Sequence, residues 1–215
     1  MKQVQGIFAS IAAAMLLAGS CYAGTVDLPR TGQQTCFDSA GKTIACTGTG
    51  QDGDKQAGNP WPVPRFTDNN NGTVTDNLTG LVWLRNAGCF ASKAYNFSDS
   101  IAACSALANG ACGLSDASKA GDWRLPNINE LRSLVDYSRV RPSLSAGHPF
   151  YNVQSYLYRS SSDASNSAYS MNVSINDTTG NYGSGVVTDG SNTGWGGKTY
   201  NGAGIMNVWP VRNAQ

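Results

Sequence analysis

The chain has 215 residues, of which 40% are hydrophobic and only 13% are charged. Its formal net charge of +1 provides no global attraction to nucleic acid, so a nucleic-acid partner is not expected. The length allows one domain with an extension, and the 25 glycines are typical of exported, loop-rich domains that contain β-structure.

The first 23 residues have the pattern of a secretory signal peptide. Lys2 supplies a positive charge, residues 7–18 are apolar, and Cys21-Tyr22-Ala23 fits a small-x-small cleavage site. The apolar run is too short to span a membrane, so no transmembrane span is expected. We therefore predict an exported protein, in the periplasm, at the cell surface or secreted. Lipoprotein processing at Cys21 is the less favoured alternative, because Ala18 stands where a lipobox usually has leucine.

Residues 24–61 are predicted to form a cysteine-containing extension and linker that precedes the main domain at residues 62–215. Cys36 and Cys46 bracket a short hairpin pattern, and disulfides are the default in exported proteins, so we expect these two to pair. Residues 47–59 are rich in Gly, Gln and Asp and are predicted to be the linker. Prolines on both sides of Trp61 predict a stiff, extended lead into the domain.

Residues 66–84 have the pattern of antiparallel strands joined by two turns. Asn and Gly in residues 68–72 tolerate positive φ, which favours the first turn, and residues 77–80 form the second. The same Asp-Asn-Asn-Asn-Gly string raises calcium as an alternative. However, Thr79 stands where a helix-loop-helix calcium site needs a bidentate Glu, and no metal or other cofactor is expected.

A helix is predicted around Cys104, since Phe97, Ile101, Cys104 and Ala108 recur at helical steps. This spacing places the Cys104 thiol inside the protein, as a small hydrophobe. Zinc is the competing interpretation. It is disfavoured because no cysteines of the mature chain have Cys-x-x-Cys spacing and the chain has a single His.

A second helix is predicted after Pro126, which excludes helical angles at the residue before it. Asn127 is a favourable N-cap, and Glu130 stands three residues later, where its carboxylate can reach back to the cap. The apolar residues that follow share one face of this helix. They are Ile128, Leu131, Leu134 and Val135.

The string Trp123-Arg124-Leu125-Pro126-Asn127-x-x-Glu130-Leu131 resembles the signature of the Lcl C-terminal-domain family, named for a bacterial collagen-like adhesin. Further segments extend the resemblance over about residues 62–213. They are residues 66–83, 89–90, 112–114, 158–162 and 208–212. A related string occurs in formylglycine-generating enzymes, so the resemblance implies a distant, C-type-lectin-like fold. It also favours pairing of Cys89 with Cys112, which flank the first predicted helix in loops and would leave Cys104 free.

Strands are further predicted at residues 156–160, 168–174 and 204–212, with Pro210 at an edge or bulge of its sheet. The predicted fold class is therefore α+β: two short helices, small antiparallel sheets and long irregular loops. Of the 45 residues from Ser160 to Gly204, 29 are Ser, Gly, Thr or Asn. This tract is predicted to be a long surface loop or, alternatively, a ligand surface in which aromatic residues stack on sugars. Its candidate aromatic residues are Tyr182, Trp195 and Tyr200.

Between Trp123 and Ser160, five arginines stand against two acidic residues. Arg124 is expected to be engaged beside the capped helix, and Arg159 is the last of the five. The others are expected to be exposed, and guanidinium groups match sulfate and carboxylate well. These candidate ligand-binding residues are Arg132, Arg139 and Arg141.

The sequence contains no nucleophile elbow and no phosphate-binding glycine loop, so an enzyme is not expected. The formylglycine-generating enzymes, which activate sulfatases, depend on cysteines in their C-terminal part. This chain has no cysteine after Cys112, so the resemblance does not imply that activity. We predict a non-catalytic recognition or adhesion domain for an extracellular ligand. The resemblance implies an anionic glycan. The alternative is a structural or assembly module of a cell-envelope complex, with an envelope protein as its partner, and self-association is left open.

Overall fold

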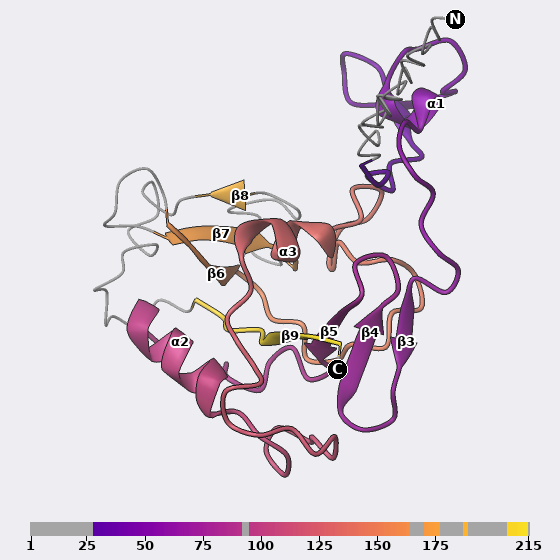
Figure 1. Cartoon of the computed structure of the whole chain (residues 1–215). Helices are drawn as coiled ribbons and strands as arrows, with labels where there is room; N and C mark the ends of the chain where they lie inside the picture. Colours follow the sequence, from indigo (N-terminus) through magenta and orange to yellow (C-terminus); the bar gives the residue numbers. More distant parts are fainter. Residues whose placement is uncertain (1–27, 92–94, 164–169, 177–186, 189–205, 215) are drawn as a thin grey trace, which may run out of the picture.

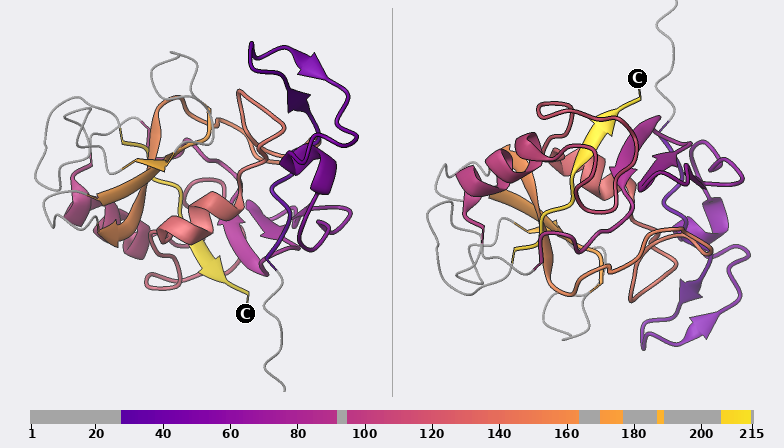
Figure 2. Two further views of the ribbon diagram at one scale, coloured as in Figure 1. Left: turned by 90° about the horizontal axis from the view of Figure 1, so that it is seen from above. Right: turned by 90° about the horizontal axis from the view of Figure 1, so that it is seen from below.

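The structure is a computed structural model that describes residues 28–91, 95–163, 170–176, 187–188 and 206–214. It confirms the α+β class. The described residues form three short helices and three small antiparallel sheets with the strand orders β1-β2, β3-β4-β5-β9 and β6-β7-β8, joined by long loops (Figure 1). In both views of Figure 2, the N-terminal extension lies at the end of the molecule opposite to α2 and the third sheet.

The extension is folded where a linker was expected. Its hairpin is formed by β1 (Cys36–Phe37) and β2 (Thr43–Ile44), and the expected disulfide Cys36–Cys46 is present. Helix α1 (Asp52–Lys55) interrupts the predicted linker. The Asp54 carboxylate accepts hydrogen bonds from the backbone N–H groups of Gly48 and Gly50. These local side-chain bonds satisfy the backbone of the segment, which explains why a Gly-rich stretch adopts a defined turn and helix.

The second sheet has the predicted strands and turns within residues 66–84, and the C-terminal strand β9 pairs with them. Its strands are β3 (Phe66–Asp68), β4 (Thr73–Asp76), β5 (Leu81–Leu84) and β9 (Val211–Asn213). The Asp68 carboxylate, a ligand in the calcium alternative, accepts from Asn70 N–H and forms an ion pair with Arg85 at 3.2 Å. It thus has a structural role in the turn.

Helix α2 (Phe97–Ala106) buries Cys104 as predicted, but one prediction about this helix is wrong. Ile101 is 43% exposed, because Ser100 and Cys104 form the buried side. Ala108 lies beyond the end of the helix. The Asn96 side chain caps the helix by accepting from Asp99 N–H at 2.8 Å. Ser100 can be buried because its hydroxyl donates to Asn96 O at 2.7 Å.

The disulfide Cys89–Cys112 is present, and Cys104 is a free, buried thiol, as predicted. Burial raises the pKa of the Cys104 thiol to about 12. Because the thiolate is the reactive form, we expect iodoacetamide at pH 8 to leave native Cys104 unmodified. The same reagent should label it once the chain is unfolded in denaturant without a reductant. Peptide mass mapping checks this, and labelling of Cys104 in the native protein would contradict it.

Helix α3 (Ile128–Ser133) has the predicted cap in full. Asn127 Oδ1 accepts from Glu130 N–H at 2.9 Å, and Glu130 Oε2 accepts from Asn127 N–H at 2.8 Å. The Glu130 carboxylate also forms a bidentate ion pair with Arg124, with distances of 2.7 and 2.6 Å. Arg124 in turn pairs through its backbone with Val211, the first residue of β9. Through Arg124, the family signature therefore connects the N-terminus of α3 to the C-terminal strand β9.

Stability should depend on pH through Glu130. Burial by itself raises its pKa, but the hydrogen bond from Arg124, the Asn127 N–H and the Arg124 charge together hold the pKa below its usual value. A lowered folded-state pKa means that its contribution is present above the unfolded-state value and is lost as pH falls through the folded-state value. We expect Glu130→Gln to be less stable than the wild type near neutral pH. In urea melts, the difference should shrink as pH falls below about 4.5; a constant difference would contradict the prediction.

The third sheet and the C-terminal segment complete the core. The sheet contains β6 (Leu157–Asp163), β7 (Ser170–Ser174) and β8 (Val187–Thr188). Trp209 is fully buried between the sheets, with ring centroids 5.7 Å from Trp83, 4.9 Å from Phe150 and 5.1 Å from Tyr158. Its indole N–H donates to Leu84 O at 2.7 Å. The predicted last strand is shorter than expected, because β9 begins only after Pro210.

No helix in the described part of the chain is long and apolar enough to cross a membrane. The predicted signal peptide, the lipidation alternative at Cys21 and most of the polar tract lie outside the described residues, and these stay predictions.

Candidate functional site

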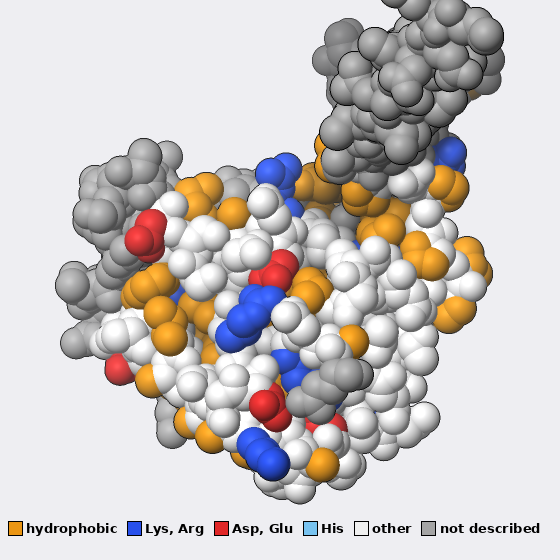
Figure 3. Space-filling view, viewed as in Figure 1, with side chains coloured by type: hydrophobic (Ala, Val, Ile, Leu, Met, Phe, Trp, Pro, Cys, Tyr) orange, Lys and Arg blue, Asp and Glu red, His pale blue; other side chains and the backbone are white. Residues whose placement is uncertain are grey.

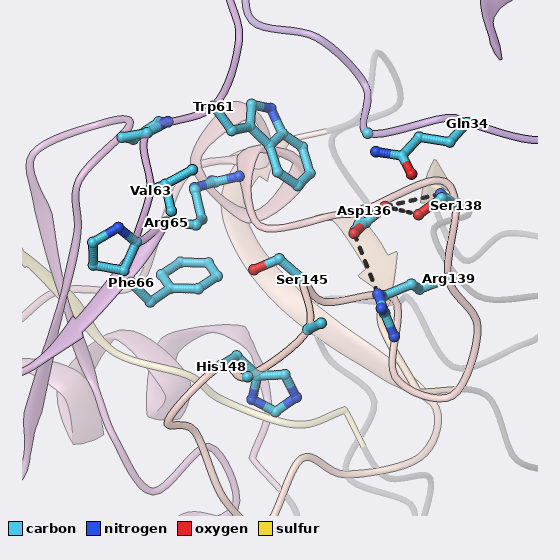
Figure 4. Close-up of a pocket in the computed structure, with 15 residues that line it drawn as sticks. Gln34, Trp61, Val63, Arg65, Phe66, Asp136, Ser138, Arg139, Ser145 and His148 are labelled. Atoms are coloured by element: carbon cyan, nitrogen blue, oxygen red, sulfur yellow. Dashed lines mark hydrogen bonds and ion pairs between the residues drawn. The ribbon is translucent and has the colours of Figure 1, made fainter.

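A cleft of about 460 Å³ lies where the N-terminal extension meets the main domain. Gly32, Gln34 and residues 61–66 come from the extension and the start of β3, and residues 136–148 come from the loop after α3. Figure 4 shows Trp61, Arg65 and Phe66 along one side of this cleft and Gln34, Asp136, Ser138 and Arg139 along the other. Ser145 and His148 lie between these two sides. The volume falls in the range of about 300–1,000 Å³ typical of small-ligand sites.

The extension is held against the domain by directed contacts. Tyr137 N–H donates to Thr31 O at 3.1 Å. Within the extension, the Trp61 indole N–H donates to Arg30 O at 2.7 Å and holds Trp61 beside this contact. Gly32 adopts a φ of +86°, and a Cβ at this position would lie 2.6 Å from Asp136 Oδ1 and 2.8 Å from Trp61 Cη2. The extension can approach the domain this closely because Gly32 has no side chain.

Arg65 connects the aromatic side of the cleft to the core. Its guanidinium lies 4.5 Å from the Trp61 ring and 4.8 Å from the Phe66 ring. It forms a bidentate ion pair with Asp76, at 2.7 and 2.9 Å, and also donates to Ser133 O at 2.7 Å. The third nitrogen, Nη1, is buried and has no hydrogen-bond partner among the described residues. Arg65 therefore packs against Trp61, and its charge is already paired with Asp76 inside the protein.

The polar side of the cleft is arranged by Asp136. Its Oδ1 accepts from Ser138 N–H at 2.9 Å and from Ser138 Oγ at 2.6 Å, and its Oδ2 lies 3.7 Å from Arg139 Nε. Asp136 is buried, whereas the side chain of Arg139 is 49% exposed. The carboxylate thus holds Ser138 and Arg139 at the rim.

Gln34 and Ser145 present hydrogen-bonding groups to the cleft, and His148 presents a neutral imidazole ring. Within the described part of the chain, neither the Gln34 side-chain amide nor the Ser145 hydroxyl has a hydrogen-bond partner. Burial lowers the pKa of His148, a hydrogen bond with the backbone of Phe150 raises it, and the charge of Arg139 lowers it; the net shift is downward. His148 is therefore neutral at pH 7.

The structure separates the arginines that the sequence grouped together. Arg139 lines the cleft, whereas Arg132 and Arg141 are exposed but are not part of its lining. Arg159 does not add to the surface charge: it is 1% exposed and donates to Ser170 Oγ at 3.0 Å. Burial lowers the pKa of Arg159 to about 10. The surface excess of positive charge is thus smaller than a residue count indicates.

The predicted aromatic residues of the polar tract stay a prediction. Tyr182, Trp195 and Tyr200 lie outside the described residues. Sequence reasoning instead missed Gln34, Ser145 and the functional position of Trp61, which was interpreted as part of a stiff lead. Trp61 between two prolines was the available signal, since a large aromatic residue on an extended segment needs a surface to pack on.

Comparison with known proteins identifies one family. The model of the family described as "Lcl C-terminal domain" matches residues 72–212, which is more than half of the chain. No curated protein and no solved structure was found to match, so the relation to formylglycine-generating enzymes stays a prediction. The matched residues include the loop at 136–148 but not Gln34, Trp61 or Arg65. The chain belongs to the Lcl C-terminal domain family.

Proposed function

We propose that this chain is an exported, non-catalytic recognition domain of the adhesion type, and that it binds an extracellular glycan at the cleft. The observation that carries the proposal is the composition of the cleft. An aromatic side formed by Trp61 and Phe66 faces a side that contains an amide, hydroxyl groups and a guanidinium. Aromatic rings pack on the apolar faces of sugar rings, and the polar side chains can bind their hydroxyl groups.

Exposed arginines extend this surface toward acidic groups of the glycan. Arg139 lies at the rim of the cleft, and Arg141 follows two residues later on the same exposed loop. Guanidinium groups bind sulfate and carboxylate through parallel hydrogen bonds. We therefore propose an anionic glycan as the ligand, with Arg132 as a third, more distant contact.

A non-catalytic role agrees with how the carboxylates at the cleft are used. Asp136 accepts hydrogen bonds from Ser138 and is paired with Arg139, and Arg65 is paired with Asp76. General acid–base catalysis needs a titratable group that faces the substrate with its proton available. These carboxylates instead organise the walls of the cleft, so we propose no reaction and no cofactor for this site.

The test is retention of the mature, disulfide-intact chain on a sulfated-glycan column across a salt gradient. Retention should weaken steeply with salt, because exposed charges are screened, and replacing Arg139 and Arg141 together by alanine should weaken it further. Gly32→Ala should also weaken it, since the added methyl group clashes with Asp136 and Trp61. Gly41→Ala is the matched control, because Gly41 has a similar φ of +77° but a Cβ added there would meet nothing within 4 Å.

Two outcomes would contradict the proposal. Absence of binding to any glycan, sulfated or neutral, would argue against a glycan-recognition role. Equal retention of the Gly32→Ala and Gly41→Ala variants would separate glycan binding from the cleft.

An assembly module of a cell-envelope complex is the second candidate. Val63, on the rim of the cleft, is 97% exposed, and Val140 is 72% exposed. Exposed apolar side chains of this kind would be buried in the core of an interface with a protein partner. Co-purification of an envelope protein that is lost on Val63→Ser and Val140→Ser replacement, with no glycan binding, would favour this candidate.

A further inference from the structure

The charges that line the cleft cancel one another. Arg65 is paired with Asp76, and Arg139 with Asp136. Burial keeps His148 neutral, because it lowers the pKa of the ring. Figure 3 shows a similar balance on one outer face of the molecule, where basic and acidic side chains are few and interspersed. The cleft therefore presents hydrogen-bonding groups without a net charge.

A charged group gains little by entering such a site. An anion would have to compete with Asp76 for Arg65, whose side chain is only 5% exposed, and disrupting a buried pair leaves an uncompensated charge. A neutral hydroxyl group, in contrast, can bind an amide or another hydroxyl and leave both ion pairs intact. The interior of the cleft thus favours an uncharged, hydroxyl-rich ligand, and the acidic groups of a glycan remain at the exposed arginines.

The shape of the lining also fits a ring that has an apolar face and a polar edge. Trp61 and Val63 supply apolar surface on one side of the cleft. Gln34 and Ser138 supply polar atoms on the other side, and Ser145 lies between the two sides. The Ser138 hydroxyl donates to Asp136, which leaves its oxygen lone pairs for a ligand hydroxyl. A pyranose has this distribution of surfaces, because its C–H bonds cluster on a face and its hydroxyl groups lie around the edge.

We propose that the cleft binds a neutral pyranose unit, with its apolar face toward Trp61 and its hydroxyl groups toward Gln34 and Ser145. This inference rests on the proposed glycan-recognition function and names the sugar class that the site selects. Gln34 and Trp61 both precede residue 72, where the family match begins. The preference for a neutral sugar therefore depends on the N-terminal extension of this chain, which adds Trp61 and Gln34 to the residues that the family domain contributes to the cleft.

The experiment uses the mature, disulfide-intact chain and a panel of neutral methyl glycosides, namely those of glucose, galactose, mannose, N-acetylglucosamine and N-acetylgalactosamine. Binding is measured by saturation-transfer-difference NMR, with titrations for any glycoside that gives a signal. We expect at least one glycoside to bind with an affinity that changes less than about twofold between low and high salt, since no net charge is involved. Gln34→Ala and Ser145→Ala should each weaken binding about 3- to 10-fold, through loss of one hydrogen bond.

The matched control is Lys119→Gln, an exposed position that does not line the cleft, and it should leave glycoside binding unchanged. Thermal melts establish that each variant is folded. Binding restricted to sulfated glycans, lost with salt and indifferent to Gln34→Ala and Ser145→Ala, would overturn this inference but keep the proposed function. Glycoside binding that ignores both cleft variants would also overturn it, because the sugar would then bind elsewhere. Absence of binding to every neutral and sulfated glycan would reject both proposals.

Discussion

Replacing Asp76 by alanine is expected to lower the free energy of unfolding by about 3–5 kcal/mol. Asp76 has a fully buried side chain and receives two hydrogen bonds from Arg65. It also accepts from Leu78 N–H and from Thr79 Oγ, both at 2.9 Å. The substitution leaves the Arg65 charge uncompensated in a side chain that is 5% exposed. Urea melts monitored by tryptophan fluorescence measure the loss.

Variants of both members of the ion pair test whether this loss of stability comes from the pair. In the double variant Arg65→Met with Asp76→Leu, no buried charge remains, so the loss should be smaller than the sum of the two single losses. Arg139→Ala is the comparison for an exposed pair, and it should cost at most about 1 kcal/mol. Equal, small losses for Asp76→Ala and Arg139→Ala would show that the Arg65–Asp76 pair contributes little to folding.

Leu131→Ala is expected to cost about 2–5 kcal/mol, because it opens a cavity in the core. Leu131 is fully buried on α3 and belongs to the same cluster as Trp123, Leu134 and Trp209. The volume-conserving change Leu131→Met should cost less than about 1.5 kcal/mol. Denaturant melts of the disulfide-intact chain provide the measurement, with an unchanged slope as the sign that the native state is intact.

Substitutions at two other positions provide comparisons for the loss of stability expected at Leu131. Asn127→Ala removes the cap of the same helix but opens no cavity, so about 1 kcal/mol is expected. Ile101→Ala lies on the exposed side of α2 and should change stability by less than about 0.5 kcal/mol. If Leu131→Ala were no more destabilising than Asn127→Ala, α3 would not pack into the core as the structure describes.

In the proposed function, the N-terminal extension contributes to ligand binding, because it supplies part of the lining of the cleft. The extension supplies Trp61 on one side of the cleft and Gln34 on the other, and it is held to the domain through Thr31, Gly32 and Tyr137. We therefore expect binding of the proposed ligand to be coupled to docking of the extension. A ligand that contacts both walls stabilises the docked arrangement, because it binds this arrangement more tightly than a separated one.

The sequence by itself determined the features that depend on neighbouring residues. The cap of α3 follows from Asn127 and Glu130, three residues apart, and the turns at 68–72 and 77–80 follow from residues that tolerate their backbone angles. The Cys36–Cys46 disulfide closes a short hairpin that is visible in the sequence. In each case the residues that interact are close along the chain, so local stereochemistry restricts the possible structures to a few.

The tertiary structure decided which distant residues meet. Gln34 and Ser145 are more than 100 positions apart, and they line one cleft only because the extension docks beside the loop after α3. Hydrophobic periodicity predicted that Ile101 is buried, but α2 packs with Ser100 and Cys104 on its buried side and leaves Ile101 exposed. The count of arginines likewise included Arg159, which the third sheet buries. Burial, pairing of charges and the meeting of surfaces depend on packing across the whole fold, and no local pattern in the chain specifies them.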